Sequence, residues 1–236
     1  MPSRRDFLRA AAALAATQLL PLVPAQAQVP PKHPGQAPGF FRLQVGDVEV
    51  TALYDGAGLI RPEILHGAPP DRLAALMEDA GLDPKVGEPT AINAFLLNTG
   101  RNLILVDAGG GTALGPRAGL LPANLRASGY EPGQVDTVLL THLHPDHVLG
   151  LTGPDGMPLF PNAVARPATA EADYWLSDER LASAPEQRKR SLLALRALAE
   201  AYSGLGKWKP FGPGEIPAEG LTAEPLPGHT PGHCGF

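Results

Sequence analysis

Apolar and polar positions alternate in the first half of the chain in a way that predicts two β-hairpins. Residues 40–54 read as FRLQV and VEVTALY on either side of Gly46-Asp47, a dipeptide typical of a tight turn. Residues 91–97 and 103–106 form a second pair of apolar stretches around Asn98-Thr99-Gly100. We therefore expect antiparallel strands in this half of the chain.

Helical spacing of apolar residues becomes prominent later in the chain. The longest such segment is 185–202, in which Leu192, Leu195 and Leu198 form an apolar stripe. Shorter helices are expected over 70–80, 121–128 and 168–177. Three further stretches have the length and apolar content of strands: 136–141, 162–166 and 221–226. Strands and helices in this order predict an α/β fold with functional loops at the ends of strands.

The N-terminal segment has the pattern of an export signal. A basic stretch, Ser3 to Arg9, precedes an uncharged and mostly apolar run from Ala10 to Val23, and Ala25-Gln26-Ala27 offers a small-x-small cleavage pattern. The paired arginines Arg4 and Arg5 resemble a twin-arginine signal. The apolar run is shorter than the about 20 residues that span a membrane, so we expect no stable membrane anchoring. We expect residues 1–27 to be removed and residues 28–236 to form one domain in the periplasm.

Composition narrows the class of protein and the class of partner. Hydrophobic residues make up 44% of the 236 residues and charged residues 18%, as in packed globular proteins. The net charge is −5 and no basic cluster follows the N-terminal segment, which argues against a nucleic-acid partner. Cys234 is the only cysteine, so the sequence excludes an internal disulfide and a cysteine-rich zinc site. A bound metal must therefore be held by histidines and carboxylates.

A compact histidine motif follows the expected strand 136–141. His142 and His144 are two positions apart, and side chains at that spacing on an extended segment point to the same side. Pro145 is expected to turn the chain away from both helix and strand, which brings Asp146 and His147 out beyond the turn, placed for a second ion. Imidazole and carboxylate suit zinc, and also iron, manganese or cobalt.

A second histidine loop, Gly228-His229-Thr230-Pro231-Gly232-His233, follows the expected strand 221–226. The segment THLHPDH together with GHTPGH resembles the metallo-β-lactamase superfamily. The resemblance implies an αβ/βα sandwich with a di-metal site at the sheet edges. The chain is most similar to the methyl parathion hydrolase-like branch from about Pro38 to His233, for example at Gly39-Phe40-Phe41-Arg42, at Leu105 to Gly109 and at Ala172 to Ser177.

The resemblance also implies roles for single residues. His142, His144 and His229 would hold the first of two zinc ions, and Asp146 and His147 the second. The family also has a bridging aspartate and a last histidine beyond this loop, and the chain ends at Phe236 before either. We therefore expect a sandwich truncated at its C-terminus, with two protein ligands at the second site.

Four residues are candidates for chemistry or substrate binding. Asp146 would be the catalytic group that orients the attacking water or takes its proton. Asp107 has two alternatives: it orients a ligand histidine, or it forms the turn before Gly109. Trp175 and Phe160 are expected to line an apolar substrate pocket.

The expected activity is hydrolysis of a small ester-like molecule by a metal-bound hydroxide, the substrate being a lactone, an aryl ester or a phosphotriester. The alternatives are a glyoxalase-II-like thioesterase, a β-lactamase, or an inactive metal-binding fragment. A thioester with a charged carrier would need a basic binding patch, and none is obvious in the sequence. The sequence is compatible with a homodimer and does not determine the oligomeric state.

Overall fold

The computed structural model describes residues 29–33 and 35–236, so the expected export signal lies outside the described residues. The chain divides into two units, residues 1–36 and residues 37–236. No helix or strand occurs in the described residues of the first unit. The second unit contains all the elements discussed below.

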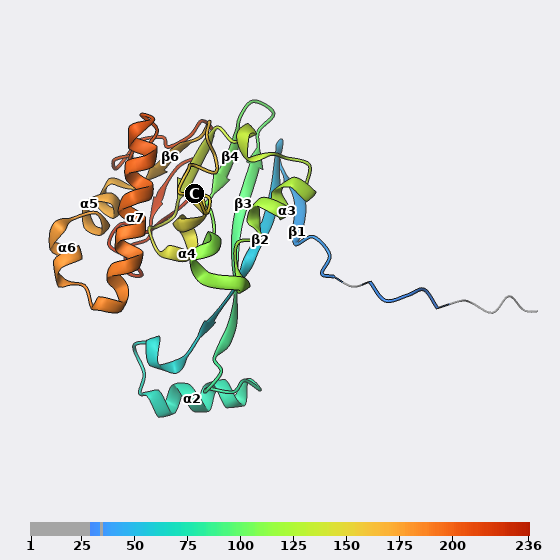
Figure 1. Ribbon diagram of the computed structural model, residues 1–236, viewed down its shortest axis with the longest axis vertical. Coiled ribbons are helices and arrows are strands. Elements are labelled where there is room, and N and C mark those ends of the chain that lie inside the picture. Colours follow the sequence, from blue (N-terminus) through green and yellow to red (C-terminus); the bar gives the residue numbers. More distant parts are fainter. Residues whose placement is uncertain (1–28, 34) are drawn as a thin grey trace, which may run out of the picture. The chain divides into compact units, whose positions relative to one another are not determined.

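A six-stranded sheet forms the centre of the second unit, with the strands in sequence order (Figure 1). The strands are β1 (Phe40–Val45), β2 (Val48–Ile60), β3 (Glu88–Asn98), β4 (Leu103–Val106), β5 (Thr137–Leu140) and β6 (Val164–Pro167). The first four pair antiparallel, and β4, β5 and β6 pair parallel. Both predicted hairpins are confirmed as β1 with β2 and β3 with β4, whereas the long pairing of β2 with β3 was not predicted.

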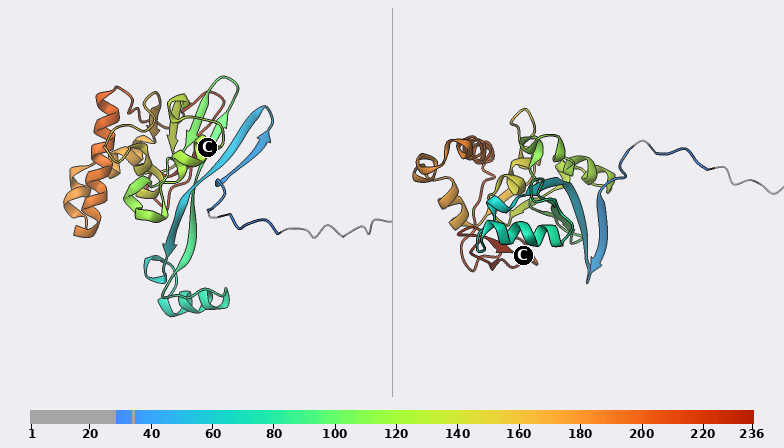
Figure 2. Two further views of the ribbon diagram at one scale, coloured as in Figure 1. Left: turned by 45° about the vertical axis from the view of Figure 1, so that its right-hand side comes forward. Right: turned by 90° about the horizontal axis from the view of Figure 1, so that it is seen from below.

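The long hairpin carries α2 (Pro70–Asp79) and the short helix η1 (Pro62–Ile64) at its far end (Figures 1 and 2). The pairing of β2 with β3 shifts register between Tyr54 and Gly56, where the chain passes close to residue 117. A side chain at Gly56 would place its Cβ 2.0 Å from the carbonyl oxygen of Arg117, so only glycine fits there.

The connections between the parallel strands are helical. η2 (Gly111–Arg117), α3 (Leu121–Ala127) and η3 (Pro132–Gln134) join β4 to β5, and α4 (Pro145–Val148) with η4 (Leu149–Leu151) leads towards β6. After β6 the chain forms α5 (Thr169–Trp175), α6 (Asp178–Ser183) and α7 (Glu186–Gly204), which lie together on the β6 side of the sheet (Figure 1). Among the described residues, no helix has the length and apolar character needed to cross a membrane.

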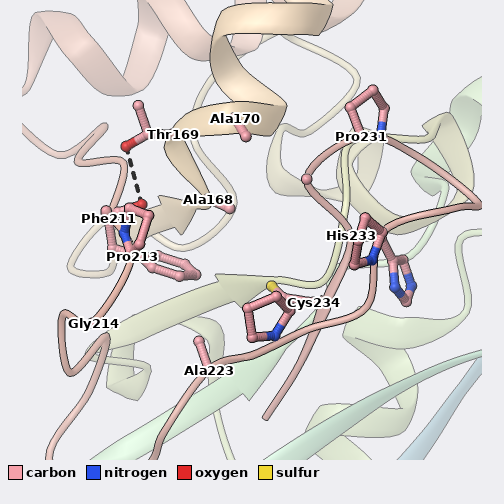
Figure 3. A pocket seen from close by; sticks show the side chains of 14 residues that line it. Ala168, Thr169, Ala170, Phe211, Pro213, Gly214, Ala223, Pro231, His233 and Cys234 are labelled. Carbon is pink, nitrogen blue, oxygen red and sulfur yellow. Dashed lines mark hydrogen bonds between the residues drawn. The ribbon is translucent and has the colours of Figure 1, made fainter.

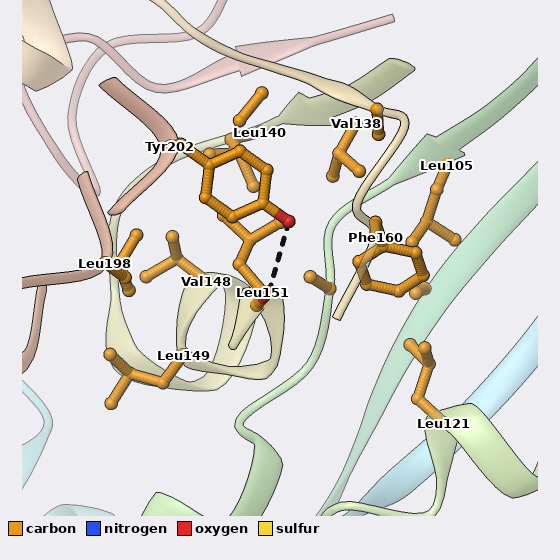
Figure 4. Close-up of a cluster of buried hydrophobic side chains, with 14 of the residues drawn as sticks. Leu105, Leu121, Val138, Leu140, Val148, Leu149, Leu151, Phe160, Leu198 and Tyr202 are labelled. Atoms are coloured by element: carbon orange, nitrogen blue, oxygen red, sulfur yellow. Dashed lines mark hydrogen bonds between the residues drawn. The ribbon is translucent and has the colours of Figure 1, made fainter. Parts of the chain in front are cut away.

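The hydrophobic core lies between the sheet and these helices. The predicted stripe of α7 is confirmed, because Leu192, Leu195 and Leu198 are all buried in the core. Tyr202 of the same helix is wholly buried, and its hydroxyl donates a hydrogen bond to the carbonyl oxygen of Leu151 at 3.1 Å (Figure 4). That bond satisfies the one polar atom that this ring brings into the core.

Two local expectations from the sequence were wrong. Pro145 does not turn the chain away from helix but begins α4, because the first position of a helix needs no N–H donor. The strand expected over 221–226 is only β7 (Glu224–Pro225), paired with β8 (Cys234–Gly235). The short helix α6 was not predicted from the sequence. Its N-cap is Ser177, whose hydroxyl accepts a hydrogen bond from the Arg180 amide at 3.1 Å.

Candidate metal centre

The histidine motif occupies the turn between β5 and α4. Thr141 follows directly after β5, and His144 is the N-cap of α4 with an extended backbone. His142 is buried, whereas Asp146 and His147 lie in the first turn of the helix and are partly exposed. The motif therefore presents two histidines from extended chain and two further ligands from helix.

Three imidazole nitrogens converge beside this turn. Nε2 of His142 lies 3.1 Å from Nδ1 of His144, which lies 2.9 Å from Nε2 of His229. Burial and the neighbouring imidazoles lower the pKa of His142 to about 2 and that of His144 to about 4. Both rings are therefore neutral near pH 7, so lone pairs are available at the point where the rings meet. Three converging imidazoles fit a divalent ion such as zinc, which the structure therefore accommodates.

One carboxylate determines which nitrogen of His142 is free. The hydroxyl of Thr141 lies 2.9 Å from Oδ2 of Asp107 and 3.0 Å from Nδ1 of His142. In the tautomer that satisfies both contacts, Nδ1 of His142 donates to the hydroxyl and the hydroxyl donates to Asp107. Nε2 of His142 then carries the lone pair that faces His144.

His147 lies between two carboxylates. Its Nδ1 is 2.7 Å from Oδ2 of Asp107, and its Nε2 is 3.4 Å from Oδ2 of Asp146. Burial alone would lower the pKa of His147, but hydrogen bonds to Asp107 and Asp146 raise it to about 10. Burial likewise opposes ionisation of Asp146, and the contact with His147 nevertheless lowers its pKa to about 2. A cation bound by Asp146 and Nε2 of His147 must therefore displace a proton.

Asp107 combines the two alternatives considered for it, because it lies in a turn and its carboxylate contacts a histidine. Its backbone has a φ of 61°, a left-handed conformation that aspartate adopts more readily than most residues. Its amide donates to the carbonyl oxygen of Leu139, and the next amide, of Ala108, donates to the carbonyl oxygen of His147, both at 2.8 Å. The turn therefore aims the Asp107 carboxylate at His147.

The downstream histidine loop packs against the same turn. The amide of Cys234 donates to the carbonyl oxygen of Thr141 at 3.0 Å, which brings residues 228–233 beside the motif. The ring of His233 lies 5.0 Å from that of His142, and its Nδ1 is buried without a hydrogen-bond partner in the described part of the chain. Burial raises the pKa of the Cys234 thiol to about 12, so this thiol is not a nucleophile near neutral pH.

A cavity of about 410 Å³ opens beside the candidate metal ligands. His144, Asp146 and His229 form part of its wall, and Trp175 lies beside them with its ring 5.1 Å from that of His144. Phe160, in contrast, is wholly buried in the hydrophobic core, so the expectation that it lines the substrate pocket was wrong (Figure 4).

A second cavity, of about 240 Å³, lies against the loop 228–233 (Figure 3). It is lined mostly by small and apolar side chains, with His233 and Cys234 on its wall. None of the three converging histidines lines it. We therefore place the chemistry in the larger cavity, where the lone pairs meet.

The sequence model of the metallo-β-lactamase superfamily matches residues 87–236 of this chain. The chain belongs to the metallo-β-lactamase superfamily. It is a hydrolase of that superfamily, and its histidine triad is arranged to bind a divalent metal. The mixed α/β fold predicted from the sequence is confirmed.

Solved structures agree with this membership. The hydrolase AbOPH of the β-lactamase superfamily shares 36% identity with a TM-score of 0.76, over 85% of this chain and 69% of that one. AidC, a dizinc quorum-quenching lactonase solved with a product, N-hexanoyl-L-homoserine, shares 26% identity with a TM-score of 0.73, over 83% and 69%. A probable metal-dependent hydrolase from Staphylococcus aureus shares the fold at 23% identity and a TM-score of 0.65, over 81% and 69%. Comparison with curated proteins gives no significant match.

Sequence reasoning about this superfamily hydrolase missed two arginines of the larger cavity. Arg180 comes from α6 and Arg188 from α7, and nothing local in the sequence indicates that both face one cavity. The guanidinium of Arg180 lies 5.0 Å from the ring of Trp175, a distance typical of a cation–π contact. The cavity wall therefore carries the positive charge that the sequence did not reveal.

Sequence reasoning also missed Glu171, a wholly buried carboxylate in α5. In the sequence it is one of two acidic residues of a short helix, the other being Asp173. A signal was present in its spacing from Trp175, because positions i and i+4 face each other on a helix.

Proposed function

We propose that this protein hydrolyses an ester-like bond in a small, largely apolar molecule: a lactone, an aryl ester or a phosphotriester. The observation that carries the proposal is the convergence of His142, His144 and His229, of which His144 and His229 line the larger cavity. The similarity to AidC, itself a lactonase, supports the choice of an ester-like substrate. The resemblance to the methyl parathion hydrolase-like branch supports the same class.

We propose zinc as the metal, with the triad as one site and Asp146 with His147 as the protein ligands of a second. Iron, manganese or cobalt would suit the same donors. A divalent ion bound there would supply a Lewis acid and would lower the pKa of its water.

The chain's own residues would orient the attacking water, accept its proton and provide an apolar surface for the substrate. Asp146 is ionised near neutral pH and lies on the cavity wall, where it can orient the attacking water or accept its proton. Apolar side chains, among them Ile60, Leu149 and Trp175, line the cavity and would hold the apolar part of a substrate while excluding bulk water.

A second candidate function is hydrolysis of a thioester with an anionic carrier. The specific observation that favours it is the pair Arg180 and Arg188 on the cavity wall, since guanidinium groups bind carboxylates and phosphates well. No described ion pair involves either arginine, so both are available to a ligand.

One panel distinguishes the two candidates. Metal-depleted protein reloaded with zinc is assayed on an N-acyl homoserine lactone, 4-nitrophenyl acetate, a dialkyl 4-nitrophenyl phosphate and S-lactoylglutathione. We expect turnover of a neutral ester-like substrate, loss of that turnover with a chelator, and loss of it in His144→Ala. Turnover of S-lactoylglutathione alone, weakened in Arg180→Gln but not in the matched Arg190→Gln on exposed α7 surface, would favour the thioesterase instead.

A further inference from the structure

The Glu171 carboxylate is buried among three N–H donors and no cation. Its Oε2 accepts hydrogen bonds from the Leu143 amide at 3.0 Å and from the Trp175 indole at 2.8 Å. Its Oε1 accepts one from the Gly232 amide at 2.7 Å. None of the ion pairs between described side chains includes Glu171. Burying a carboxylate costs free energy, which these three hydrogen bonds offset.

Two of the three donors belong to the segments that present the proposed metal ligands. Leu143 lies between His142 and His144 in the motif, and Gly232 lies three positions after His229 in the downstream loop. Leu143 and Gly232 are 28 and 61 positions away from Glu171 along the chain. One side chain thus bridges two loops that lie far apart in the sequence.

We propose that Glu171 is a positioning residue of the metal site, which holds the two histidine loops at the separation at which their imidazoles converge. A carboxylate suits this role because its two oxygens accept from two loops at once. An apolar side chain would leave two backbone amides without partners, and an amide side chain would oppose one of them with a second donor.

Gly232 supports the proposal independently. A Cβ at this position would lie 2.7 Å from the Glu171 amide nitrogen and 2.9 Å from the Cβ of Ala170. The downstream loop therefore docks directly onto the first turn of α5, and a side chain would force it away. The loop that carries His229 is built to approach Glu171 closely.

The same carboxylate holds in place the Trp175 side chain, which lines the larger cavity. Trp175 lies one helical turn after Glu171, and its indole nitrogen is tied to Oε2. Its ring contacts His144 edge-on at a centroid distance of 5.1 Å. Glu171 therefore links the position of an aromatic cavity wall to that of the histidines.

The proposal is tested by measuring metal affinity rather than turnover. The full chain, stripped with a chelator, is titrated with Co²⁺ and with Zn²⁺, and the visible spectrum of the cobalt form reports the ligand geometry. We expect Glu171→Gln to raise the dissociation constant about tenfold and to change the cobalt spectrum. Asp173→Asn, an exposed change on the same helix, should leave both within twofold of the unaltered chain. Thermal unfolding of the metal-free forms separates a loss of stability from a loss of affinity.

The proposal is overturned if Glu171→Gln is folded and binds both ions with unaltered affinity and spectrum. If Glu171→Gln does not fold, Gly232→Ala decides, because it leaves the carboxylate and α5 intact and displaces only the downstream loop. An unchanged affinity in Gly232→Ala overturns the proposal, and a raised dissociation constant supports it. The inference rests on the metal-binding part of the proposed function, whose failure looks different: the unaltered chain would then bind neither ion.

Discussion

Nδ1 of His147 lies 2.7 Å from a carboxylate oxygen of Asp107, a residue 40 positions earlier in the chain. The same carboxylate accepts from the hydroxyl of Thr141, which contacts Nδ1 of His142. One aspartate at the end of β4 is therefore in contact with one histidine directly and with another through a hydroxyl. In both rings Nδ1 is occupied, so that Nε2 of His142 faces His144 and Nε2 of His147 faces Asp146.

Asp107→Asn should weaken metal binding, because the amide offers only one acceptor oxygen to the Thr141 hydroxyl and the His147 ring. We expect zinc affinity, measured by calorimetry on the reloaded full chain, to fall about ten- to a hundredfold. Thr141→Val isolates the His142 half of this contact and should produce the smaller loss. Asp47→Asn, in the exposed turn between β1 and β2, is the control. Unaltered affinity in Asp107→Asn would show that this carboxylate does not orient the ligands.

Loss of any one imidazole of the triad should lower the tightly bound metal to well under one equivalent per chain. His142→Ala, His144→Ala and His229→Ala each leave two converging nitrogens, which hold an ion loosely. His66→Ala, an exposed histidine outside the triad, should retain the metal. Elemental analysis of the purified proteins is the measurement, and full metal content in His229→Ala would exclude the downstream loop as a ligand.

Phe160 and Trp175 should respond differently to truncation. Phe160→Ala removes a wholly buried ring from the core and should destabilise the protein by about 3–5 kcal/mol in urea unfolding. The exposed ring of Phe95 gives a matched control, for which Phe95→Ala should cost no more than about 0.5 kcal/mol. Trp175→Leu should instead raise KM for an aryl ester, since Trp175 lines the cavity. A stable Phe160→Ala protein with a raised KM would reverse this assignment.

The N-terminal pattern makes a prediction about export. Replacing Arg4 and Arg5 with lysine preserves the charge but removes the paired arginines that twin-arginine signals require. We expect the altered protein to remain in the cytoplasm, as judged by cell fractionation and immunoblotting. Export of the double variant at the normal level would count against a twin-arginine signal.

Much of this protein was determined by local sequence. The hairpins around Gly46 and Gly100 and the stripe Leu192, Leu195 and Leu198 were predictable because the alternation of apolar residues states which face of an element is buried. The spacing of His142 and His144 after a strand likewise placed two imidazoles on one side of the chain.

The tertiary structure decided how distant segments meet. The alternation and spacing of apolar residues indicate which face of a helix or strand is buried, but they do not indicate which other segments pack against that face. Phe160 was expected in the pocket and lies in the core, and Arg180 and Arg188 come together only because α6 and α7 pack beside the cavity. Glu171 gave only a weak signal in the sequence, and in the fold its carboxylate accepts hydrogen bonds from three segments of the chain. A buried carboxylate is stable only where donors surround it, and two of its three donors come from loops that only the folded chain brings together.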